Sequence, residues 1–223
     1  MAPGAISVLD PAVRRTNGHL PPLPPTGGGD GPSPGPAPSQ PFLDNLRLAI
    51  LFFIGAEIML FGGLVSAFLV LRLSAPVWPP PFQPRLPVFV TGLNTLVLIG
   101  SSVAMVAAGR ALRRGNRQAL VRRLVGTAAL GAVFLAVQGY EWVRLVSFGL
   151  TVSSGSYGTT FYGLIGTHAA HVLGALVWLC VTTLLAAHGR FAGGRTAPVS
   201  ACAIYWHFVV CLWPVLYIAV YLS

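Results

Sequence analysis

The sequence predicts an all-α protein, a polytopic bundle of five transmembrane helices with its amino terminus in the cytoplasm. Of its 223 residues, 54% are hydrophobic and 9% are charged, whereas soluble domains carry about 25% charged residues. Five apolar runs are each long enough to cross a hydrocarbon core of about 30 Å as a helix. The 14 basic residues are all arginine, and most of them lie beside these runs. This placement favours contact with lipid headgroups over a nucleic-acid surface.

The amino-terminal segment differs from the rest of the chain in composition. Residues 1–41 contain 11 Pro and 7 Gly and show no hydrophobic periodicity, which is typical of disorder. They also lack the apolar run of a cleavable signal peptide. We therefore expect a disordered, Pro/Gly-rich cytoplasmic tail over 1–41 and a five-helix transmembrane domain over 42–223.

The first expected span, 48–71, lies between Arg47 and Arg72, and a Pro-rich loop at 74–87 leads to the second span, 88–109. Four small polar side chains of the second span are expected to hydrogen-bond to backbone or to neighbouring helices. They are Asn94, Thr95, Ser101 and Ser102.

The later spans are separated by polar segments. Residues 110–123 hold six Arg and are expected to form a loop, whose side chains would contact anionic lipid headgroups. The residues assigned to that contact are Arg113, Arg114, Arg117, Arg122 and Arg123. The remaining expected spans are 124–145, 161–187 and 201–222.

The arginines are distributed unevenly between the two expected faces of the membrane. Eleven lie in the amino-terminal segment and in the connections at 110–123 and 188–200, and three lie on the opposite face. Because cytoplasmic loops are enriched in Arg and Lys, this asymmetry predicts a cytoplasmic amino terminus and an external carboxyl terminus.

Glu57 is the one ionisable side chain in the first span. Helical rise places it about 14 Å from the Arg47 end, near the midplane. A carboxylate there costs about 2.5–3.5 kcal/mol on insertion scales, so we expect Glu57 to be protonated, hydrogen-bonded, or both. On the fourth span, His171 falls at about 15 Å and His168 at about 10 Å, on one helix face. The sequence therefore predicts a contact between Glu57 and His171, direct or through water.

Three further polar side chains are candidates. Gln138 is expected at about the depth of His168, Glu141 near the outer surface, and His207 about 9 Å from the cytoplasmic boundary. A metal site is the sharper alternative for these histidines, but His168 and His207 differ in depth by about 11 Å, too far for one ion with ligands at about 2 Å.

Four segments match a known family in order and in spacing over residues 46–223. They are GAEIMLFGG (55–63), QGYEW (138–142), SYGTTFYGLIGTHAAHVLG (156–174) and YWHF (205–208). Together they resemble subunit III of the haem–copper terminal oxidases, which include cytochrome c oxidase, in its five-helix bacterial form.

The resemblance implies a non-catalytic subunit of an aerobic respiratory oxidase in a bacterial inner membrane. Haem and copper would belong to the partner subunits I and II, and this chain would hold phospholipid and support proton uptake. It would contain no catalytic residue, bind no metal and contact no nucleic acid. Glu57 corresponds to the family's buried carboxylate. His168, His171 and His207 correspond to histidines of the family that bind no metal.

Two features depart from the family's common pattern. The seven-helix form has two further helices at its amino terminus, in place of which this chain has the Pro/Gly-rich tail. Val210 stands where the family commonly has Asp, so the role of that Asp does not carry over.

Several alternatives remain open. Within the superfamily, the second candidate is the equivalent subunit of a quinol oxidase or a nitric oxide reductase, which the sequence does not separate because the electron donor docks elsewhere. From other classes, a membrane metalloenzyme would use His168, His171 and Glu57, and a small proton-coupled transporter would need a continuous polar path.

Overall fold

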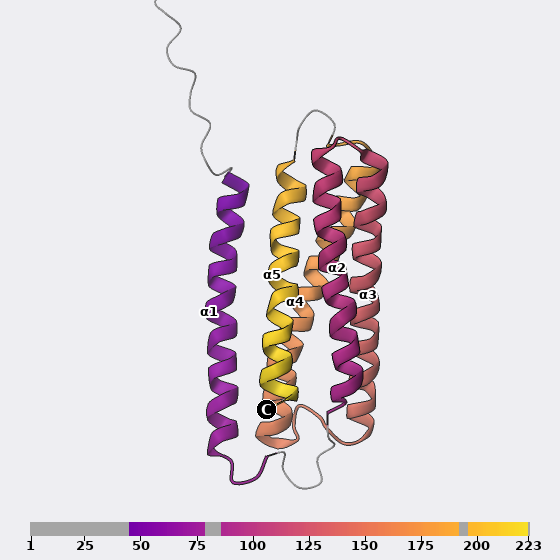
Figure 1. Ribbon diagram of the computed structural model, residues 1–223. Helices are drawn as coiled ribbons and strands as arrows, with labels where there is room; N and C mark the ends of the chain where they lie inside the picture. Colours follow the sequence, from indigo (N-terminus) through magenta and orange to yellow (C-terminus); the bar gives the residue numbers. More distant parts are fainter. Residues whose placement is uncertain (1–44, 79–85, 192–195, 223) are drawn as a thin grey trace, which may run out of the picture. The chain divides into compact units, whose positions relative to one another are not determined.

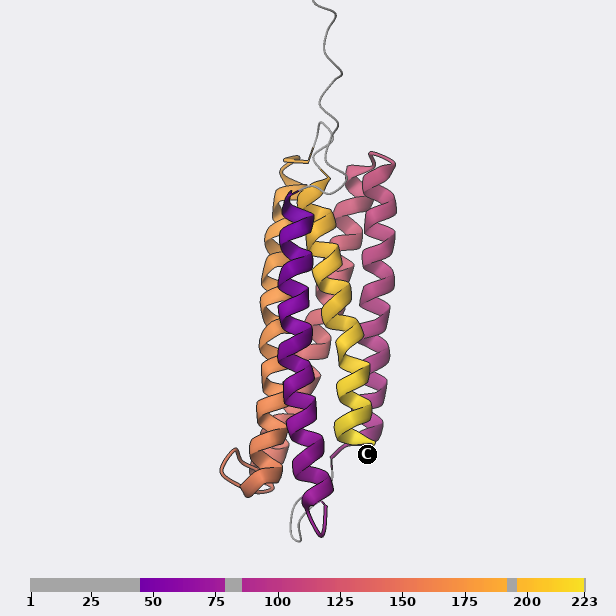
Figure 2. The same ribbon diagram turned by 90° about the vertical axis from the view of Figure 1, so that its left-hand side faces the viewer.

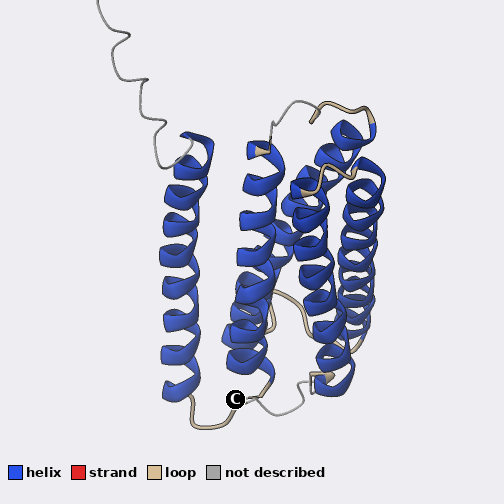
Figure 3. Cartoon of the chain, turned by 45° about the horizontal axis from the view of Figure 1, so that its top comes forward, coloured by secondary structure: helices blue, strands red, loops and turns tan. Residues whose placement is uncertain are grey.

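Within its described residues, the chain forms five long helices that alternate in direction (Figure 1). This computed structural model describes residues 45–78, 86–191 and 196–222. The helices are α1 (Asn45–Ser74), α2 (Val88–Arg113), α3 (Arg117–Ser147), α4 (Gly155–Ala187) and α5 (Ala197–Tyr221). All five are long and apolar enough to cross a membrane, and the described ranges contain no strand (Figure 3). The predicted all-α class and the five spans are confirmed, while the predicted tail over 1–41 lies outside the described residues.

The Arg-rich connection is shorter than the sequence predicts. The expected loop over 110–123 is wrong, because α2 continues to Arg113 and α3 begins at Arg117. A transmembrane helix can continue beyond the hydrocarbon core through charged residues, because arginine is a good helix former. The six arginines therefore lie in or next to the last turn of α2 and the first two turns of α3.

The turn between α2 and α3 is closed by backbone and side-chain hydrogen bonds. Gly115 has φ = 66°, a left-handed conformation that glycine adopts without a steric penalty. The N–H groups of Gly115 and Asn116 donate to carbonyl oxygens in the last turn of α2, at 3.0 and 3.1 Å. Asn116 then caps α3, because its Oδ1 accepts from the backbone N–H of Ala119 at 2.9 Å.

Replacing Asn116 with alanine is expected to destabilise the protein by about 1 kcal/mol, because the N–H of Ala119 loses its acceptor. Asn116→Asp keeps an acceptor at the same place and should retain most of the stability. The measurement is the midpoint of thermal unfolding of the full-length protein in detergent, followed by circular dichroism. A capping role would be contradicted by equal losses in the two variants.

Helix α1 is the least enclosed element. It packs against α4 and α5 (Figure 2), and within the described part of the chain it does not pack against α2 or α3. In its most apolar window 11% of residues are buried, against 28–39% in the other four helices. The buried residues of α1 are Glu57, Phe61 and Phe68. The packing of α1 therefore depends on a narrow strip of its surface that includes the buried acid.

The centre of the bundle is filled by two tryptophans of α5, seven residues apart. Trp206 and Trp213 are both almost completely buried. The Nε1–H of Trp206 donates to Ser101 Oγ at 3.2 Å, and that of Trp213 donates to Thr95 Oγ1 at 2.9 Å. Each indole thus has a partner on α2 for its polar group, as buried tryptophan requires.

The polar side chains of α2 hydrogen-bond as the sequence predicts. Thr95 and Ser101 donate to backbone carbonyls of α2 itself, at 2.8 and 2.6 Å. Asn94 donates to the carbonyl oxygen of Phe134 on α3 at 3.0 Å. Ser102 Oγ lies 2.5 Å from Nδ1 of His207 on α5. Two of these four contacts join α2 to a neighbouring helix, so the polar groups contribute to helix association.

Candidate functional site

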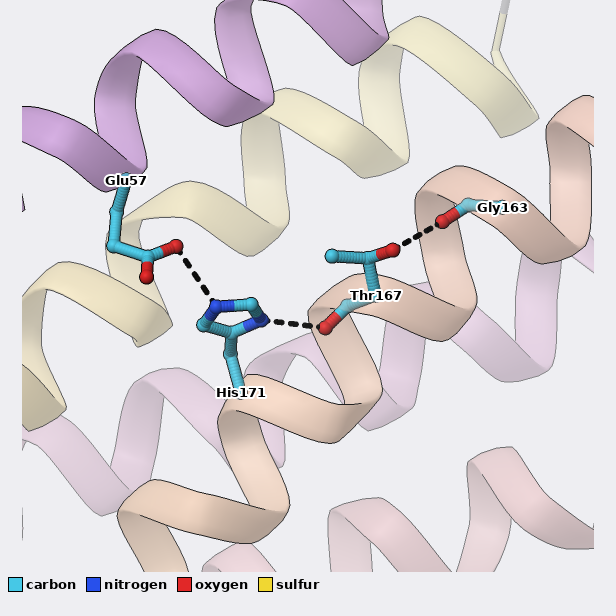
Figure 4. Close-up of polar contacts among 4 residues, drawn as sticks. All are labelled: Glu57, Gly163, Thr167 and His171. Carbon is cyan, nitrogen blue, oxygen red and sulfur yellow. Dashed lines mark hydrogen bonds and ion pairs between the residues drawn. The ribbon is translucent and has the colours of Figure 1, made fainter.

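The structure brings Glu57 of α1 and His171 of α4 together. Glu57 Oε2 lies 2.8 Å from His171 Nε2 (Figure 4). The carboxyl group is buried, with a residue exposure of 6%. The 2.8 Å approach to the imidazole is an ion-pair contact, since Oε2 has no regular hydrogen-bond partner among the described residues. The contact joins the outlying helix to the rest of the bundle.

The surroundings of His171 Nδ1 determine how many protons the Glu57–His171 pair carries. His171 Nδ1 lies 2.7 Å from the backbone carbonyl oxygen of Thr167. A carbonyl oxygen only accepts, so Nδ1 carries a hydrogen. A carboxylate facing the lone pair of a neutral Nε2 at 2.8 Å would be repulsive. We therefore infer that the pair carries one further proton, on the acid or on the ring. In both cases the Glu57–His171 pair has no net charge, which suits a membrane interior.

Aromatic rings shield the pair. Phe61, one turn beyond Glu57 on α1, meets the His171 ring edge-on with centroids 5.2 Å apart. Phe61 also lies edge-on to His168, at 6.2 Å. Phe61 therefore contacts both histidines and lies beside the Glu57–His171 pair, while the His171 side chain keeps a relative exposure of 20%.

His168 is placed differently from His171. It is completely buried, and its ring stacks on Trp213 with centroids 5.1 Å apart and planes at 24°. Neither ring nitrogen has a hydrogen-bond partner within the described ranges. His168 and His171 thus share one helix face, as predicted, yet only the second meets the acid of α1. His168 packs instead as a flat ring in the centre of the bundle.

The remaining polar candidates lie apart from the Glu57–His171 pair. Gln138 is buried and donates from Nε2 to the hydroxyl of Tyr221 at 3.1 Å. Glu141 is also buried, and its Oε1 lies 3.6 Å from an exposed guanidinium nitrogen of Arg144. His207 is half-buried against Ser102, nearer the end of the bundle where α5 begins. The predicted residues therefore do not form one site, because only Glu57 and His171 contact each other and the rest contact other residues.

The arginines assigned to lipid headgroups also differ among themselves. The guanidinium of Arg117 donates to the carbonyl oxygens of Ala186, at 3.2 Å, and Ala187. It thereby satisfies backbone groups at the carboxyl end of α4. Arg113 lines two cavities at the same end of the bundle. All five of these arginines are exposed, and the other three are Arg114, Arg122 and Arg123.

Across residues 45–78, 86–191 and 196–222, no three His, Cys, Asp or Glu side chains converge as a metal site would require. Some of the buried polar groups instead pair between helices, as Glu57 does with His171 and Gln138 with Tyr221. Sequence reasoning missed several of their partners, above all Tyr221, Thr95 and the aromatic face of α5. The near-heptad spacing of Trp206, Trp213 and Tyr221 was the available signal, since such residues share one helix face.

The fold and this arrangement define a polytopic membrane protein in which a neutral acid–imidazole pair holds one helix against an aromatic-rich four-helix bundle. A family model for cytochrome c oxidase subunit III matches residues 39–223. Cytochrome c oxidase subunit 3 of Synechocystis sp. is 36% identical over 192 residues, which cover 85% of this chain and 81% of that protein.

Animal relatives match to a similar degree. Cytochrome c oxidase subunit 3 of Canis lupus is 36% identical over 183 residues (79% of this chain and 69% of the relative), and that of Scyliorhinus canicula is 35% identical over 189 residues (82% and 71%). The chain belongs to the cytochrome c oxidase subunit III family.

Proposed function

We propose that this chain is a non-catalytic subunit III of an aerobic respiratory haem–copper oxidase, in which it supports the catalytic subunit, holds phospholipid and assists proton uptake during oxygen reduction. Haem and copper reside in the partner subunits I and II. The chain lies in a bacterial inner membrane with a cytoplasmic amino terminus and an external carboxyl terminus. Family membership over residues 39–223 supports the assignment, and the Arg asymmetry supports the orientation.

The single observation that carries a supporting role is the Glu57–His171 contact at 2.8 Å. An intramembrane acid that exchanged protons with water would need a chain of polar groups leading to the surface. Glu57 instead has an aromatic ring on one side and a histidine on the other, and that histidine is tied to a backbone carbonyl. The pair therefore positions α1, and proton uptake is assisted indirectly through the shape of the subunit.

Lipid contact is proposed for the arginines at the α2–α3 end of the bundle. Arg114, Arg122 and Arg123 are exposed there, and each Arg near an anionic membrane surface contributes about 1 kcal/mol to attraction. Arg117 contributes less, because its guanidinium is already hydrogen-bonded to α4.

Co-purification tests the function. The tagged full-length chain, extracted from its native membrane in mild detergent, should bring with it a haem-containing chain and a copper-binding chain, seen by reduced-minus-oxidised spectra and mass spectrometry. Oxidation of reduced cytochrome c by that complex supports the proposal. Activity with quinol or nitric oxide in its place assigns the chain to one of the related complexes. A chain that purifies without haem, or with its own stoichiometric metal, would refute the proposal.

A further inference from the structure

Four buried polar side chains gather at the end of the bundle where α2 begins and α5 finishes. Thr91 and Asn94 belong to α2, Gln138 to α3 and Tyr221 to α5. Their exposed fractions are 1%, 4%, 3% and 7%, in that order. We call these four residues the Asn94 cluster. It shares no residue with the Glu57–His171 pair.

The antiparallel packing of α2 and α3 brings the cluster together. Asn94 Nδ2 donates to the carbonyl oxygen of Phe134 at 3.0 Å, which places these two residues opposite each other. Thr91 lies one turn before Asn94 on α2. Gln138 lies one turn after Phe134 on α3, so both are displaced toward the same end of the bundle. There Gln138 Nε2 donates to the Tyr221 hydroxyl at 3.1 Å, and Thr91 lies beside that hydroxyl.

Hydrogen bonding within the Asn94 cluster is incomplete. Asn94 Oδ1 and Thr91 Oγ1 are buried and have no hydrogen-bond partner of regular geometry among the described residues. The Tyr221 hydroxyl accepts from Gln138, so its own hydrogen needs an acceptor as well. Buried polar groups in native proteins are almost always paired, because an unpaired one costs the free energy of its desolvation. The cluster therefore calls for a further group that both donates and accepts.

The unpaired atoms specify a small, neutral ligand. Asn94 Oδ1 can only accept, whereas the hydroxyls of Thr91 and Tyr221 can donate. One water molecule meets all three groups, and buried waters typically make about three hydrogen bonds to such atoms. A cation would be repelled by the side-chain NH₂ group of Gln138, and an anion by Asn94 Oδ1.

The space between α3 and α5 suits such a molecule at this level. Within the described ranges the backbones of these two helices do not pack against each other, so side chains fill the space between them. Nearer the centre those side chains are aromatic, with Trp206 over Gly131 and Trp213 edge-on to Phe134. At the level of Tyr221 they are polar, as the lining of a buried water site must be.

We propose that the Asn94 cluster binds one buried water molecule, which donates to Asn94 Oδ1 and accepts from the hydroxyls of Thr91 and Tyr221. The water joins α2 to α5 and, through Gln138, to α3. It completes the hydrogen bonding at the junction of three helices. The site is independent of the oxidase assignment, because it depends on the packing of this chain alone.

The first test is a high-resolution map of the full-length chain, by cryo-EM of the complex it purifies with or by crystallography of the chain itself. The wild-type map should show ordered density between the two hydroxyls and Asn94 Oδ1. Thr91→Val, which keeps the shape of the side chain without its hydroxyl, should lose this density, and Thr91→Ser should keep it. The proposal is overturned if these groups bond directly to one another with no density between them. Density that survives unchanged in Thr91→Val overturns it too.

Thermal unfolding in detergent gives a second readout. If the Thr91 hydroxyl bonds the water, Thr91→Val should lower the unfolding midpoint by several degrees. An unchanged or higher midpoint would mean that the variant removes an unpaired group, and would overturn the proposal. The matched control is Thr127→Val on α3, whose buried hydroxyl donates to the carbonyl oxygen of Arg123 in its own helix at 2.9 Å. It should lower the midpoint less and leave the water density in place.

The identity of the ligand is tested by changing the buffer. Replacing sodium with choline should leave the density at the Asn94 cluster unchanged, because water occupies the site under both conditions. Density that disappears with sodium would identify a bound cation and would refute the water site.

Discussion

Replacement of Gly131 by alanine is expected to destabilise the bundle by about 1–3 kcal/mol, the usual cost of overpacking a well-packed core. A β-carbon at this position of α3 would lie 2.5 Å from Cη2 and 2.9 Å from Cζ2 of Trp206. The indole has little room to retreat, because it is 1% exposed and its Nε1–H is bonded to Ser101. Thermal unfolding of the full-length protein in detergent should show a midpoint lower by several degrees.

The matched control for this prediction is Gly126→Ala on the same helix. A β-carbon there meets nothing within 4 Å, so the variant should be neutral or slightly stabilised, because alanine is the better helix former. If Gly126→Ala and Gly131→Ala lowered the midpoint equally, the loss would come from α3 itself and the close approach of Trp206 would not be its cause.

Replacement of His171 by leucine is expected to be the most damaging single change at the Glu57–His171 pair. It leaves Glu57 buried without the imidazole that it contacts, at a cost of about 1–3 kcal/mol if the acid stays neutral. Glu57→Gln should cost less than about 1 kcal/mol, because an amide N–H can donate to Nε2 in place of the shared proton. It should leave assembly with partner subunits intact. The measurement is unfolding of the full-length protein in mixed detergent micelles, with haem co-purification as the readout of assembly.

The double variant Glu57→Leu/His171→Leu distinguishes the stability that comes from the contact between the two side chains from the stability that each contributes by packing alone. Because two apolar side chains leave no unpaired group, the double variant should be more stable than His171→Leu alone. A double variant as unstable as the sum of the two single leucine variants would mean that the two side chains act independently. Complete loss of the complex in Glu57→Gln would show that hydrogen bonding alone does not account for the role of this acid.

Sequence reasoning predicted the positions of residues along the membrane normal, that is, the spans and the depth of each side chain. Helical rise is constant, so counting residues places Glu57 and His171 at the same depth without knowledge of their neighbours. The five spans follow from the same principle, since a hydrocarbon core requires runs of about 20 apolar residues. The 2.8 Å separation of Oε2 and Nε2 agrees with that depth estimate.

The neighbours of each side chain within the membrane plane could not be predicted in this way. Three residues turn a helix by about 300°, so His168 and His171 point about 60° apart, and one meets α1 while the other stacks on Trp213. Which helix lies beside which is decided by side-chain shape, as in the insertion of Trp206 over Gly131. The contact of Arg117 with the carbonyl oxygens of α4 was not predicted for a different reason. An arginine next to a transmembrane span is usually interpreted as a contact with lipid headgroups.

The position of α1 has a consequence for how the chain is made. Of the five described helices, the one synthesised first, α1, packs against α4 and α5, which are synthesised last of the five, and not against the two that come between. Until α4 is synthesised, Glu57 lacks the histidine that neutralises it, and the nascent helix waits in the bilayer with an unpaired acid. Chains stalled before α4 should therefore be removed by membrane proteases far faster than chains stalled after α5, so the completed pair also marks a finished subunit.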